Sequence, residues 1–234
     1  MRLLPNCSLS KAFHAAALAV ALCAAPASHA GVIDFETPVA SNLVFDGDVI
    51  KQGKYFVEGI GNGFVGTIDN NEACFNVQCP VNNATHYYSA LADGYLAFGM
   101  LDHSAFTLSS IDASFLGASS EGYPSVAALL YIAAYDASGF VDEIYLSLSG
   151  PTNGSFNFAT FDLSAFGSGQ QFTDVLVASF ACNDAGDCNR NTNQAQFAVD
   201  NIVTLGASDV PEPATFALFG LGLLGLAHAR RRAA

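Results

Sequence analysis

The sequence predicts an all-β protein whose central domain is an antiparallel β-sandwich of the jelly-roll kind. Residues 31–209 contain no long stretch with helical periodicity, and Ile144, Leu146 and Leu148 recur at every second position, as in a strand buried on one face. About nine short runs of this kind, separated by clusters of Gly, Ser, Asn and Asp, are typical of a sandwich.

Turn residues mark where the expected strands begin and end. Asp136-Ala137-Ser138-Gly139 separates two strong runs and has Gly where a positive φ is expected, so it predicts a hairpin. The Asn-rich segment Asp69–Tyr88 is expected to be a long loop. The expected strands are Val32–Glu36, Tyr55–Val57, Gly94–Met100, Ala105–Phe115, Ala127–Asp136, Val141–Ser149, Phe156–Phe161, Thr173–Phe180 and Gln196–Leu205.

The N-terminus predicts a secretory signal peptide over residues 1–30. Arg2 and Lys11 are the only charges before an apolar run, and Ser28-His29-Ala30 supplies the small residues that signal peptidase reads. Cleavage is expected between Ala30 and Gly31. The mature protein is therefore expected to be exported.

The C-terminal residues 210–234 form a second targeting segment. Val210-Pro211-Glu212-Pro213 precedes an apolar run that ends before Arg230, Arg231 and Arg232. The run is shorter than the roughly 20 residues that a membrane-spanning helix needs. This order resembles the PEP-CTERM sorting signal of Gram-negative bacteria, and an ordinary C-terminal anchor is the alternative. The resemblance implies a sorting helix that associates transiently with the inner membrane, cleavage by an exosortase-type protease, and delivery to the cell surface or extracellular matrix.

The domain between these segments is strongly acidic. All but one of the 21 acidic residues lie in residues 31–209, against Lys51, Lys54 and Arg190, which gives a net charge of −17. Nucleic acid is excluded as a partner because phosphate contacts require cations. The acidity is explained by solubility outside the cell or by binding of divalent cations or sugars.

Four cysteines remain after the signal peptide, as Cys74-x4-Cys79 and Cys182-x5-Cys188. In an oxidising compartment two local disulfides are expected, although four cysteines allow three connectivities. A zinc site fits poorly, because the spacing is not C-x2-C.

The last expected strand carries a second resemblance. Gln196-Phe197-x-x-Asp200 resembles the Gln-Phe-x-x-Asp subfamily of PEP-CTERM proteins, and the acids of the first and last strands resemble those that hold a structural Ca²⁺ in carbohydrate-binding jelly rolls. That resemblance implies Asp34, Glu36 and Asp200 as calcium ligands, since Ca²⁺ takes several carboxylate oxygens. The alternative is that Asp200 caps a turn or pairs with a neighbouring backbone group.

Motifs for catalysis are absent from the sequence. It contains no G-x-S-x-G, H-E-x-x-H or phosphate-binding G-x-x-x-x-G-K-[ST] pattern, so the protein is expected not to be an enzyme. Asp102-His103-Ser104 holds the residue types of a triad, but neighbours on a strand point to opposite faces, and a turn is expected. A glycoside hydrolase would need two carboxylates facing each other across a cleft.

The remaining candidates for binding are aromatic. The chain has no Trp, eight Tyr and nineteen Phe, and Tyr87, Tyr88, Tyr95 and Tyr123 lie in or beside expected loops where they could stack on sugars. Closing the ends of the sandwich is the alternative role for these tyrosines. The leading functional hypothesis is a structural or adhesive component of an exopolysaccharide matrix, and the second is a carbohydrate-binding module.

Overall fold

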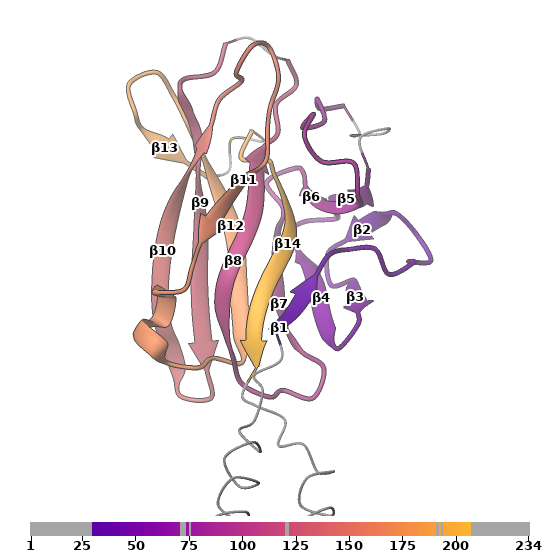
Figure 1. Ribbon diagram of the computed structural model, residues 1–234. Helices are drawn as coiled ribbons and strands as arrows, with labels where there is room; N and C mark the ends of the chain where they lie inside the picture. Colours follow the sequence, from indigo (N-terminus) through magenta and orange to yellow (C-terminus); the bar gives the residue numbers. More distant parts are fainter. Residues whose placement is uncertain are drawn as a thin grey trace, which may run out of the picture. The chain divides into compact units, whose positions relative to one another are not determined.

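The computed structural model describes residues 30–70, 74, 76–119, 122–190, 192 and 194–206. In this part of the chain two antiparallel sheets pack around a shared core, which confirms the predicted β-sandwich (Figure 1). The predicted sorting segment, residues 210–234, and the predicted signal peptide, residues 1–30 apart from Ala30, lie outside the described residues. Within the described residues no helix has the length and apolar character that crossing a membrane requires.

At the centre of the first sheet, sheet A, is the strand that contains Phe197 and Asp200 of the Gln-Phe-x-x-Asp motif. Its order is β11 (Ala159–Asp162), β8 (Phe106–Phe115), β14 (Phe197–Gly206), β6 (Tyr87–Ala90), β5 (Phe64–Asp69) and β2 (Leu43–Phe45), and β1 (Ala30–Ile33) also pairs with β14.

The second sheet, sheet B, contains the longest hairpin, and the chain crosses between the two sheets repeatedly, as a jelly roll requires. Its order is β10 (Gly139–Ser149), β9 (Val126–Asp136), β12 (Asp174–Cys182), β7 (Tyr95–Met100), β4 (Tyr55–Ile60) and β3 (Val49–Gln52), and β13 (Cys188–Asn189) pairs with β12. A short 3-10 helix, η1 (Phe166–Gly169), precedes β12.

Every expected strand overlaps an observed one, and the predicted hairpin is confirmed as the β9–β10 turn, where Gly139 has φ 118°. The expected loop Asp69–Tyr88 was wrong at both ends, because Asp69 closes β5 and Tyr87 opens β6. β2, β3, β5, β6 and β13 were not expected. All of them except β5 are short, and a run of two to four residues is too brief for a period of two to be recognised.

Aromatic side chains join the two sheets. Phe106 on β8 and Phe98 on β7 have ring centroids 6.1 Å apart, and Phe172 lies 5.1 Å from Phe106. All three are fully buried. The core therefore holds sheet A against sheet B through ring contacts, and the outer faces of both sheets remain for other roles.

Candidate functional site

Both predicted disulfides are present. Cys74 and Cys79 have their sulfur atoms 2.13 Å apart, and those of Cys182 and Cys188 are 2.03 Å apart. The second bridge ties β12 to β13, and the first lies in the segment between β5 and β6. Each closes a short loop, so it stabilises a connection at the rim rather than the sandwich as a whole.

The three predicted calcium ligands have other partners. Asp34 accepts a hydrogen bond from the Glu36 N–H at 3.3 Å, and the Glu36 carboxylate accepts the His86 N–H at 2.6 Å and lies 3.1 Å from His86 Nδ1. The His86 N–H is the main cause that lowers the pKa of Glu36. Among the described residues no three His, Cys, Asp or Glu side chains are grouped so that they could hold a metal ion. Asp34, Glu36 and Asp200 therefore do not form the predicted site in this structure.

Asp200 lies instead at the centre of a hydrogen-bond network on the outer side of sheet A. One carboxylate oxygen accepts from Asn83 Nδ2 at 2.7 Å, Thr85 Oγ1 at 3.2 Å and Asn201 Nδ2 at 3.3 Å, and the other accepts from the Asn201 N–H at 2.7 Å. Asn201 has φ 46° at a register shift in β14, which turns its amide toward both Asp200 and Asp112. The network fixes the segment before β6 onto β14, which agrees with the alternative of a structural hydrogen-bonding role for Asp200.

Two of the four tyrosines considered for stacking on sugars are not available for it. Tyr87 and Tyr88 are completely buried, because Tyr88 packs in the core between the sheets and Tyr87 packs on the other face of β6 against Phe158. Tyr123 packs edge-on against Phe115 and Phe156, with centroids 5.1 and 5.7 Å away. Asp102-His103-Ser104 is the expected turn, in which the Ser104 N–H donates to the Asp102 carboxylate.

A different aromatic group lies on the outer face of sheet B. Tyr131 on β9 is directly opposite Tyr145 on β10, with ring centroids 5.0 Å apart, and Phe180 on β12 is 6.2 Å from each of them. Their neighbours Leu130 and Leu146 point into the core, which fixes the three rings on the solvent side. Tyr145 remains 50% exposed, so ring surface is available to a ligand.

A second pair of rings extends this surface along β9. Tyr135 lies opposite Phe140, with centroids 5.9 Å apart, and Phe140 is 58% exposed. Tyr135 is four residue positions along β9 from Tyr131, or about 13 Å at the usual rise per residue. We call the surface made by Tyr131, Tyr135, Phe140, Tyr145 and Phe180 the aromatic face.

Polar groups accompany these rings. The Tyr131 hydroxyl donates to the Glu143 carboxylate at 2.8 Å, and Glu143 lies opposite Ala133, between the two groups of rings. Burial is the larger cause that raises the pKa of Tyr131, and the hydrogen bond to Glu143 raises it further. Tyr131 therefore stays a neutral donor. On the same sheet, the Arg190 guanidinium lies 4.2 Å from the centroid of Tyr95.

The comparisons with known proteins bear on the C-terminal segment. Residues 209–232 match the PEP-CTERM protein-sorting motif. The chain carries a PEP-CTERM sorting motif. This motif confirms that part of the sequence prediction and implies export in a Gram-negative bacterium. The match covers too little of the chain to assign the β-sandwich domain to a family.

No curated protein sequence matches the PEP-CTERM chain. Among solved structures, it is similar to a DUF4465 family protein from Bacteroides caccae, with 17% identity, a TM-score of 0.47, and coverage of 76% of this chain and 99% of that one. It is also similar to the C-terminal family 22 carbohydrate-binding module of Clostridium thermocellum Xyn10B, with 12% identity, a TM-score of 0.32, and coverage of 76% and 93%. Likeness at this level carries no argument about the ligand.

Proposed function

We propose that this protein is an exported, non-catalytic adhesive component of an extracellular matrix, and that it holds polysaccharide on the aromatic face. The observation that supports this proposal is the exposed ring group Tyr131, Tyr145 and Phe180, with Glu143 beside it. Aromatic rings pack against the apolar faces of sugars, while neighbouring polar groups bond the hydroxyls. The sorting motif supports an extracellular place for such a surface.

The second functional hypothesis, a carbohydrate-binding module, would use the same aromatic face to bind polysaccharide. A hydrolase is less well supported, because Glu143 already accepts a hydrogen bond from Tyr131 and lies on the outside of a sheet. We also propose membership of the Gln-Phe-x-x-Asp subfamily. Phe197 and Asp200 are both fully buried, the first in the core and the second in its network, so two of the motif residues have structural roles that would maintain them.

Binding to the aromatic face can be tested with one substitution. Tyr145→Ala is expected to weaken binding of the processed protein to the extracellular polysaccharide of the native host by at least about tenfold, because Tyr145 is the most exposed of the three packed rings Tyr131, Tyr145 and Phe180. Affinity electrophoresis in gels that contain the purified polysaccharide measures this effect.

Phe45→Ala is the matched control, since Phe45 is similarly exposed but lies on β2 of the other sheet. It is expected to migrate as the wild type does. Equal retardation of Tyr145→Ala and the wild type would remove the aromatic face from the proposal, and no retardation of the wild type would remove polysaccharide binding itself.

Processing provides a second test. The mature protein is expected to lack Met1–Ala30 and the segment beyond about Pro213, because both ends carry signals that membrane proteases recognise. Intact-mass measurement of protein from the surface fraction of the native host checks this. A surface species that retains Arg230–Arg232 would contradict removal of the sorting segment.

A further inference from the structure

The last strand of sheet B has a free edge. β3 pairs with β4 and with no other strand among the described residues. The Gly59 N–H donates to the Asp48 C=O at 3.0 Å, and Val49 follows Asp48 opposite Glu58. Backbone groups of an antiparallel strand alternate between its two sides, so Ile50 and Gln52 bond to β4, whereas the N–H and C=O groups of Val49 and Lys51 point away from it.

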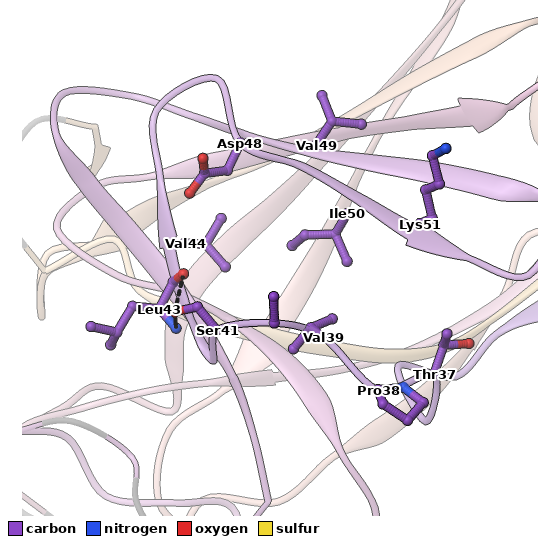
Figure 2. Close-up of a pocket in the computed structure, with 11 residues that line it drawn as sticks. Thr37, Pro38, Val39, Ser41, Leu43, Val44, Asp48, Val49, Ile50 and Lys51 are labelled. Carbon is purple, nitrogen blue, oxygen red and sulfur yellow. Dashed lines mark hydrogen bonds between the residues drawn. The ribbon is translucent and has the colours of Figure 1, made fainter.

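A groove of about 430 Å³ runs beside this edge. It lies between β3, β2 and the segment 37–41, and its lining combines apolar side chains with polar ones such as Thr37, Asp48 and Lys51 (Figure 2). Ile50 and Val39 are half-buried against the core, and Val49 is 56% exposed. Within the described residues, no hydrogen bond joins the outward backbone groups of Val49 or Lys51 to another segment. An unpaired strand edge of this kind is a template for strand addition.

We propose that β3 of a second copy of this chain occupies the edge, so that two copies pair antiparallel about a two-fold axis at Ile50. In this register Val49 of each copy is opposite Lys51 of the other. Both residues direct their backbone groups outward, so each such pair can exchange two hydrogen bonds. The strand that completes the edge is therefore the same strand, turned around.

The charges favour this occupant and this register. Val49 lies between Glu58 on β4 and Lys51 of the second copy, so the lysine stem can cover Val49 while its ammonium approaches the Glu58 carboxylate. Among the described residues neither Lys51 nor Glu58 forms an ion pair. Pairing centred on Lys51 would instead place two lysines opposite each other.

The position of the cations supports self-association at this edge. Lys51 and Lys54 are two of the three cations in residues 31–209. The net charge of this domain, −17, makes two copies repel each other elsewhere on their surfaces. A two-fold axis perpendicular to a continuous sheet leaves the outer faces of both halves on the same side. The pair would then present two aromatic faces together, and one polysaccharide chain could engage both with increased avidity.

Substitutions at Val49 test the register. Val49→Lys places a lysine opposite Lys51 of the second copy and is expected to weaken dimerisation of the processed protein by at least about tenfold, whereas Val49→Glu, equally polar, is expected to retain or strengthen it. Sedimentation equilibrium over a range of concentrations measures the dimer constant. The double variant Val49→Lys/Lys51→Glu should restore association, because the opposite charges meet again in exchanged positions.

Effects on folding separate from effects on association. Within one chain Val49 is opposite Glu58, so Val49→Lys should stabilise the monomer and Val49→Glu should destabilise it, the reverse of their effects on the dimer. Thermal melts at protein concentrations below the dimer dissociation constant measure the effect of each substitution on monomer stability. A wild-type protein that remains monomeric, or equal loss of dimer in Val49→Lys and Val49→Glu, would overturn the proposal without touching polysaccharide binding by the monomer.

Discussion

Phe106→Ala is expected to lower the free energy of unfolding by about 3 to 5 kcal/mol, the usual cost of removing a fully buried phenyl ring. Phe106 opens β8 in sheet A and contacts Phe98 of sheet B and Phe172 before β12. Its backbone also exchanges hydrogen bonds with Phe172, both 2.9 Å long. The substitution therefore leaves a cavity at a place where the backbone is held and cannot close inward.

Urea denaturation of the processed protein, followed by tyrosine fluorescence or circular dichroism, measures this loss. Phe140→Ala is the control, because Phe140 is 58% exposed and contacts one ring, Tyr135. Its effect is expected to stay below about 1 kcal/mol. A loss of under about 1 kcal/mol for Phe106→Ala would show that this aromatic cluster does not hold the two sheets together.

The fold could be predicted from the sequence because apolar residues recur at every second position in its longer strands. β9 and β10 also carry a readable turn, with Gly139 at a positive φ. The aromatic face had a partial signal, since Tyr131 and Tyr135 alternate with core residues of β9. The full set of rings could not be placed, because a register shift between Phe140 and Asp142 decides which face Phe140 occupies, and Phe180 reaches the site through the order of strands in the sheet.

The network around Asp200 shows a second limit. The Gln-Phe-x-x-Asp motif drew attention to Asp200, and Asp34 and Glu36 were its expected partners because all three carry carboxylates. Its actual partners, Asn83 and Thr85, lie over 100 residues earlier in a segment that was expected to be a loop. Hydrogen-bond partners of this separation depend on the pairing of β6 with β14, which no local pattern encodes.

Asp200 is also expected to make stability depend on pH. Its side chain is fully buried, and loss of hydration, opposed by hydrogen bonds from Asn83, Asn201 and Thr85 and aided by the charge of Asp112, raises its pKa to about 6. A carboxyl whose pKa is raised on folding binds its proton more tightly in the folded state. Its favourable contribution is therefore complete below about pH 4, its unfolded pKa, and is lost as the pH rises to about 6.

The substitution Asp200→Asn isolates this contribution, because it removes the titration and keeps the size of the side chain. The free energy of unfolding of the wild type relative to Asp200→Asn is expected to fall by about 2 to 3 kcal/mol between pH 4 and pH 7. Urea denaturation of both proteins at the two pH values gives the difference, and other acids such as Glu36 cancel because both proteins contain them. A relative stability that stays constant, or rises with pH, would mean that the donors Asn83, Thr85 and Asn201 outweigh the cost of burial and hold Asp200 ionised throughout.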